Sequence, residues 1–134
     1  MREMLAAYHS GVVGLLVLSV LVAIQFAVAD YAGIRARHVP GMPVTEGHGS
    51  FLFRATRAHA NTYENLGFFL LLVLVCVFTG ASPKWTNILI WVFVAARAAH
   101  MSLYYADLRN PRSAAFTIGA IAQVGLLVAA FLAI

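Results

Sequence analysis

Two sets of polar residues interrupt apolar stretches of the sequence at spacings typical of a helix. The first polar stripe consists of Arg57, Asn61 and Glu64, and the second polar stripe consists of Arg97, His100 and Tyr104. Intervals of three, four and seven residues place each stripe on one face of a helix. A charge at bilayer depth costs about 3 kcal/mol or more, so such residues usually face protein or water and serve a function.

The stripes carry more positive than negative charge. We expect both in the same half of a helical bundle, where an Arg97–Glu64 ion pair would offset much of the cost of burying each charge. Packing alone needs only one or two polar residues at a helix interface. Because the arginines outnumber the carboxylates, an anionic ligand would balance the charge. We therefore favour a ligand pocket over polar residues that only hold helices together.

The start of the last apolar segment has a second feature that suits a negative charge. Arg112 and Ser113 follow Asn110-Pro111, in the expected first turn of a helix. Free backbone N–H groups and the helix dipole stabilise anions at that position. A thiol held beside Arg112 would be biased towards the thiolate, and lowering its pKa by two units requires about 2.7 kcal/mol.

The composition predicts an integral membrane protein. Of 134 residues, 62% are hydrophobic and only 10% are charged, whereas soluble domains have about 25% charged residues. The apolar runs provide four spans of roughly 20 residues, which use most of the chain. We expect one all-α domain over residues 1–134, an antiparallel up-down four-helix bundle with helices at about 8–34, 51–79, 83–106 and 111–133.

Short signals mark the expected helix ends. Ser50 could cap the second helix, and the third starts at Ser82-Pro83, a serine cap followed by proline. The turn at residues 80–83 is so short that the helices it joins must be antiparallel neighbours. The first apolar run ends in Ala-Val-Ala, as before a signal-peptide cleavage site. It is longer than the apolar part of a usual signal peptide, so we interpret it as a retained helix.

Basic residues are concentrated on one side of the predicted bundle. The first and third loops with their flanks hold Arg35, Arg37, Arg54, Arg57, Arg109 and Arg112. The opposite side has only Arg2 and Lys84. The positive-inside rule places the first and third loops in the cytoplasm and both termini outside. No segment offers the exposed basic and aromatic surface of a nucleic-acid-binding protein, and no histidine has metal-ligand spacing.

Three segments resemble one family in order. Residues 57–65 read RAHANTYEN and resemble the Arg-Ala-His-x-Asn-x-x-Glu signature of membrane-associated proteins in eicosanoid and glutathione metabolism (MAPEG). Residues 96–100 read ARAAH, followed by Tyr104, and are similar to the third-helix motif of microsomal glutathione transferases and prostaglandin E synthase. Arg112-Ser113 resembles the segment that carries their thiolate-stabilising arginine.

The resemblance implies a homotrimer that binds glutathione between neighbouring copies, near the cytoplasmic side of a bacterial inner membrane. It implies that both polar stripes, with Arg54, contact or frame glutathione, and that Arg35 or Arg37 of a neighbouring copy completes the site. Arg112 would stabilise the thiolate, with Ser113 as a hydroxyl partner. The implied activity is that of a glutathione transferase or peroxidase that takes a lipophilic substrate from the membrane lipid.

The sequence departs from the family pattern in ways that leave alternatives open. The interval from Tyr104 to Arg112 is one residue short, so Arg109 could replace Arg112 in stabilising the thiolate. Phe116 stands where prostaglandin E synthase has a tyrosine, which argues against prostaglandin specificity. The alternatives are a non-enzymatic scaffold protein that binds lipid and a small proton-coupled exporter. Such exporters keep a carboxylate in the first helix, where this chain has none before Asp30.

Overall fold

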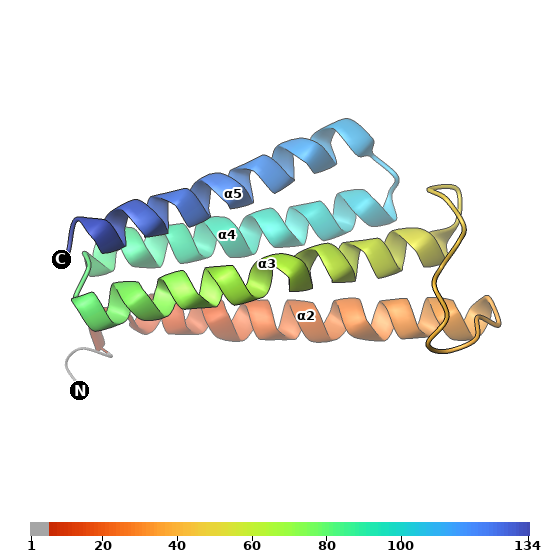
Figure 1. Ribbon diagram of the computed structural model, residues 1–134, viewed down its shortest axis with the longest axis horizontal. Coiled ribbons are helices and arrows are strands. Elements are labelled where there is room, and N and C mark those ends of the chain that lie inside the picture. The colour runs from red at the N-terminus through yellow and green to blue at the C-terminus, as the bar shows by residue number, and fades with distance from the viewer. Residues whose placement is uncertain (1–5) are drawn as a thin grey trace.

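The computed structural model describes residues 6–134, which form four long helices that run alternately up and down (Figure 1). They are α2 (His9–Arg35), α3 (Phe51–Thr79), α4 (Pro83–Tyr105) and α5 (Arg109–Phe131). α4 packs against each of the other three helices, and α5 also packs against α3. The predicted all-α antiparallel four-helix architecture is confirmed. Arg2, and with it the start of the chain, lies outside the described residues.

The helix ends differ from the expected ones by at most two residues. Ser50 caps α3, because its Oγ accepts a hydrogen bond from Phe53 N at 3.4 Å. Gly80 ends α3 in the left-handed conformation, with φ of 68°, which a residue with a side chain adopts at a cost. The expected start of the fourth helix at Pro111 is wrong. α5 begins at Arg109, two residues earlier, because a proline is tolerated within the first turn of a helix, where its missing N–H has no partner to lose.

The bundle has a core of apolar side chains and an apolar outer surface. Phe69 of α3 and Phe93 of α4 stack with ring centroids 3.8 Å apart, and both are buried with Leu18 and Leu126. Many large apolar side chains remain exposed on the outside of every helix. All four helices are long and apolar enough to cross a membrane. The exposed apolar surface therefore suits lipid as its solvent, and the protein is an integral membrane protein.

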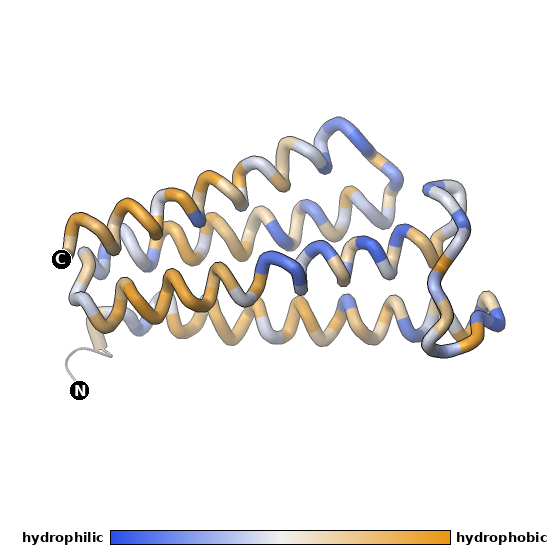
Figure 2. Tube along the Cα trace, in the orientation of Figure 1, coloured by the Kyte–Doolittle hydropathy of each residue, from blue (hydrophilic) through white to orange (hydrophobic). Residues whose placement is uncertain are grey.

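Polar residues are concentrated towards one end of the bundle (Figure 2). That end carries the long connection between α2 and α3, residues 36–50, and the short connection between α4 and α5. The other end carries the α3–α4 turn and is mostly apolar (Figure 2). Both polar stripes lie in the half of the bundle that leads to the polar end.

Candidate functional site

Arg97 is the most deeply buried charged residue of the polar stripes. Its side chain is 1% exposed, and its Nη1 donates a hydrogen bond to Asn61 Oδ1 at 3.0 Å, which joins α4 to α3. The guanidinium carbon lies 5.4 Å from the ring centroids of both Phe93 and Phe116. Gly119 of α5 leaves room for it, because a Cβ there would lie 2.8 Å from Arg97 Nη2. Three helices therefore hold this guanidinium in place.

The expected Arg97–Glu64 ion pair is wrong. Glu64 Oε1 lies 3.7 Å from Arg57 Nη1 instead, and both side chains are about half exposed. The reason is helix geometry. At 3.6 residues per turn, Arg57 and Glu64 are only about 20° apart around α3, whereas Asn61 is turned by roughly 40–60° towards α4. The first polar stripe is therefore split: Asn61 faces the bundle, and the Arg57–Glu64 pair faces outwards.

A cavity of about 330 Å³ lies next to Arg97, between α3, α4 and the start of α5. Its lining residues are Asn61, His100, Tyr104, Arg112, Ser113, Phe116 and Thr117. The guanidinium carbon of Arg112 sits 4.2 Å from the centroid of the Tyr104 ring, a cation–π contact. The lining thus contains one arginine and no carboxylate, and its charge balance favours an anion.

Some buried nitrogen atoms beside this cavity have no protein partner. Within residues 6–134, neither Arg112 Nη1 nor His100 Nδ1 makes a hydrogen bond, and Arg97 Nε makes none either. Buried polar atoms are normally satisfied, so each of these is a place for a water or ligand atom. Ser113 offers less, since its Oγ already donates to the carbonyl of Arg109 at 3.2 Å. The available donors therefore come mainly from arginine and histidine.

The α2–α3 connection reaches the mouth of the cavity. Arg54 Nη1 donates to the carbonyl oxygens of His48 and Gly49 at 2.6 and 3.2 Å, so Arg54 holds this loop and does not line the cavity. The His48 ring stacks on Tyr104 with centroids 6.2 Å apart. His48 Nδ1 also lies 3.8 Å from Asp107 Oδ1. The loop therefore contacts Tyr104, one of the lining residues, through His48.

Other basic candidates lie away from the cavity. Arg109 is exposed, and its Nε lies 3.7 Å from Asp107 Oδ1. Arg35 and Arg37 are exposed at the end of α2. Arg35 borders a separate hollow of about 480 Å³ beside the start of α3. Within one copy of the chain, none of the three lines the cavity beside Arg97.

Sequence reasoning missed three residues that shape the site. Thr117 lines the cavity one turn after Ser113, and its helical spacing from Ser113 was the available signal. Gly119 gives Arg97 its space, and His48 covers Tyr104 from a loop. No sequence periodicity links either of these to the stripes. Among residues 6–134, no three His, Cys, Asp or Glu side chains come close enough to bind a metal ion.

Comparison with known proteins gives one assignment. A sequence profile of the MAPEG family matches residues 5–132, nearly the whole chain. No curated protein matches the chain significantly. The match includes all four helices and every residue of the two polar stripes.

Proposed function

The chain belongs to the MAPEG family, and on that premise we propose that it is a membrane-bound glutathione transferase or peroxidase. The observation that carries this proposal is the cavity beside Arg97. It is lined by an arginine without a carboxylate, and Arg112 Nη1 and His100 Nδ1 remain unpartnered there within the described chain. Glutathione has two carboxylates and a thiol, so it would supply the negative charge that the lining lacks.

The roles of the residues follow from their positions. Arg112, at 4.2 Å from the Tyr104 ring, stabilises the thiolate of glutathione through its charge and the nearby start of α5. Arg97 holds Asn61 and adds positive charge behind the cavity wall. His100 and Tyr104 frame the ligand, and Ser113 is a weaker candidate for a hydroxyl contact. Arg109, which faces Asp107, is the less suitable arginine for the thiolate.

The chemistry needs no group from the protein beyond these. As a transferase, the thiolate sulfur forms a C–S bond to a lipophilic electrophile, whose leaving group or π electrons take the electron pair. As a peroxidase, two glutathione molecules reduce a lipid hydroperoxide to the alcohol and water and become the disulfide. The lipophilic partner enters from the bilayer, to which the outer surface of the helices is suited.

The exposed Arg57–Glu64 pair supports assembly of several copies. Its side chains are 44% and 58% exposed although they lie within a membrane-spanning helix. Charged groups at that depth face protein or water rather than lipid. We assign this face to the contact between copies in a homotrimer. There Glu64 would meet the amine of glutathione, while Arg57, Arg54 and the neighbouring copy's Arg35 or Arg37 would meet its carboxylates. By the positive-inside rule, the basic loops support a cytoplasmic location for this site.

Ligand-dependent stability of the purified protein tests the proposed function. Glutathione at about 100 times its Kd should raise the free energy of unfolding by about 2.7 kcal/mol. Its dimethyl ester, which has the thiol but no carboxylates, should give much less stabilisation. Equal stabilisation by the ester, or by an uncharged thiol, would contradict a site built on positive charge.

One observation favours a second function, a scaffold without turnover. Phe116 puts an apolar ring in the cavity wall, so no hydroxyl is available at that position to assist the chemistry. Steady conjugation of glutathione to a lipophilic halonitroarene, saturable in glutathione, would favour the transferase. Glutathione binding with no turnover on any halonitroarene, enone or hydroperoxide would favour the scaffold.

A further inference from the structure

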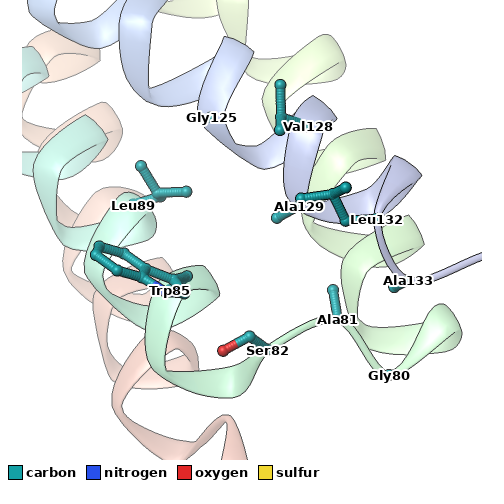
Figure 3. A pocket seen from close by; sticks show the side chains of 10 residues that line it. All are labelled: Gly80, Ala81, Ser82, Trp85, Leu89, Gly125, Val128, Ala129, Leu132 and Ala133. Carbon is teal, nitrogen blue, oxygen red and sulfur yellow. The ribbon is translucent and has the colours of Figure 1, made fainter.

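A second and larger cavity lies at the other end of the bundle from the site, beside the α3–α4 turn (Figure 3). It has a volume of about 570 Å³ and lies between α4 and α5. Trp85 and Leu89 of α4 form one wall, and Gly125 and Ala129 of α5, with Ala133 just after that helix, contribute to the other (Figure 3). We call it the apolar groove.

The shape of the apolar groove suits a hydrocarbon chain. Ala129 lies on the face of α5 that lines the groove, and Ala133 follows the end of that helix. Their small side chains leave this part of the groove open, whereas the Leu89 side chain closes it at Gly125, where a Cβ would lie 2.9 Å from Leu89 Cδ2. The rise from Gly125 to Phe131, the last residue of α5, is about 9 Å. One leaflet of a bilayer has roughly 15 Å of hydrocarbon. The groove therefore runs from the end of the helices through the outer part of one leaflet, where it can hold the upper part of one acyl chain.

A positive charge lies beside Trp85, one of the residues that line the groove. Lys84 precedes Trp85, and its Nζ lies 6.0 Å from the Trp85 ring centroid. Tryptophan and lysine at a helix end are typical of the lipid headgroup level. Among the described residues, Lys84 is the one Asp, Glu, Lys or Arg at this end, since the others lie in the polar half of the bundle.

Among the side chains of residues 6–134, no carboxylate lies at the level of Lys84. The described side-chain carboxylates belong to Asp30, Glu46, Glu64 and Asp107. Asp30, Glu46 and Asp107 lie at or near the polar end, and Glu64 lies mid-helix and is paired with Arg57. A parallel copy would hold them at those same depths. The nearby anion that a membrane supplies is the phosphate of a lipid.

We propose that the apolar groove binds an acidic glycerophospholipid, with one acyl chain between α4 and α5 and its phosphate at Lys84. This site lies at the opposite end of the helices from the cavity beside Arg97, and it does not depend on the proposed function. Its role is to hold a lipid of the non-cytoplasmic leaflet, if the basic loops face the cytoplasm.

Lipid binding by the delipidated protein tests this proposal. Phosphatidylglycerol and phosphatidylcholine with the same acyl chains are added in detergent, and the lipid bound per chain is measured by native mass spectrometry. One lysine is worth about 1 kcal/mol towards an anionic headgroup, so phosphatidylglycerol should bind about five-fold more tightly. Lys84→Gln should remove that preference, and Lys84→Arg should keep it.

A variant that fills the groove distinguishes lipid bound in the groove from lipid bound elsewhere on the apolar surface. Ala129→Phe puts a ring into the groove and should abolish retention of both lipids. Leu127→Phe adds a ring to an exposed position of α5 outside the groove and should change nothing. The proposal is overturned if both variants retain equal lipid, or if the wild type binds the two lipids equally. It is also overturned if Ala129→Phe changes the oligomeric state, because a second copy would then occupy the groove.

Discussion

At the scale of single residues, the surroundings of Arg97 explain how a buried charge is held without being neutralised. Its contacts are an amide oxygen and two aromatic rings, which stabilise a cation without neutralising it. A carboxylate at the same distance would cancel the charge and leave little attraction for an anion. The neutral amide of Asn61 therefore holds the guanidinium of Arg97 and leaves its charge in place.

Asn61→Asp should weaken the binding of glutathione without lowering the stability of the fold. The new carboxylate would lie near the present 3.0 Å from Arg97 Nη1 and would turn a hydrogen bond with one charged partner into an ion pair, whose attraction offsets the cost of burying the carboxylate. We expect the free energy of unfolding to rise or stay level and glutathione affinity to fall about ten-fold, or roughly 1.4 kcal/mol. Isothermal titration and chemical denaturation measure the two quantities. Unchanged affinity would contradict the role of unneutralised charge.

Gly119→Val should displace Arg97. Its Cβ would come within 2.8 Å of Arg97 Nη2, and such overpacking costs about 1–3 kcal/mol. We expect lower thermal stability together with weaker glutathione binding. Ala114→Val, at an exposed position of the same helix, is the matched control. If both variants resemble the wild type, the space at Gly119 does not position the guanidinium.

At the scale of helices, close packing of α2 on α4 fixes the side of the bundle away from α5. Trp91 Nε1 donates to the carbonyl and hydroxyl oxygens of Ser10 at 3.1 and 3.0 Å. Asn87 Oδ1 accepts from Gly11 N at 2.9 Å. A Cβ at Gly14 would lie 2.9 Å from Ile90 Cγ2. The glycines of α2 thus let the two backbones approach, as small residues do between membrane helices.

Gly14→Leu should push α2 away from α4. We expect a loss of about 1–3 kcal/mol from overpacking, seen as a lower midpoint in thermal unfolding of the detergent-solubilised protein. Val20→Leu, on the exposed side of α2, is the control and should be close to neutral. A Gly14→Leu variant as stable as this control would mean that the α2–α4 contact adjusts freely.

The sequence predicts the positions of the helices better than the contacts between them. Apolar run lengths and the Ser50, Gly80 and Pro83 signals are local, so they predict where a helix begins and ends. Periodicity also places Asn61 and Glu64 near one face of α3. It does not say how α3 is rotated against α4, and that rotation decides that Asn61, and not Glu64, meets Arg97. Likewise, nothing local reveals that Gly119 faces Arg97.

At the scale of the whole molecule, polar residues are concentrated at one end of the bundle, and the other end is mostly apolar (Figure 2). The half-exposed Arg57–Glu64 ion pair lies between the two ends. A single copy would leave Arg57 and Glu64 against lipid at a cost of several kcal/mol. A contact with further copies through this face of α3, as proposed, would remove that cost. The proposed site would then be complete only in the assembly.

Disulfide cross-linking tests the assembled face. Phe68 lies one turn beyond Glu64 on the same exposed side of α3. In a Cys76→Ala background, Phe68→Cys should form dimers of the chain when oxidised in the membrane. Ile88→Cys, on the exposed side of α4, should remain mostly monomeric on denaturing gels. Cross-linking at Ile88 without cross-linking at Phe68 would place the contact on another face.

The central claim is that Arg112 stabilises a glutathione thiolate, and a titration of the bound thiol tests it most directly. The ultraviolet absorbance of the thiolate is followed against pH for glutathione bound to the wild type, Arg112→Ala and Arg109→Ala. We predict that the wild type and Arg109→Ala lower the thiol pKa by about two units, worth about 2.7 kcal/mol, and that Arg112→Ala abolishes the shift. An unshifted thiol in the wild type, or an equal shift in Arg112→Ala, would contradict the account.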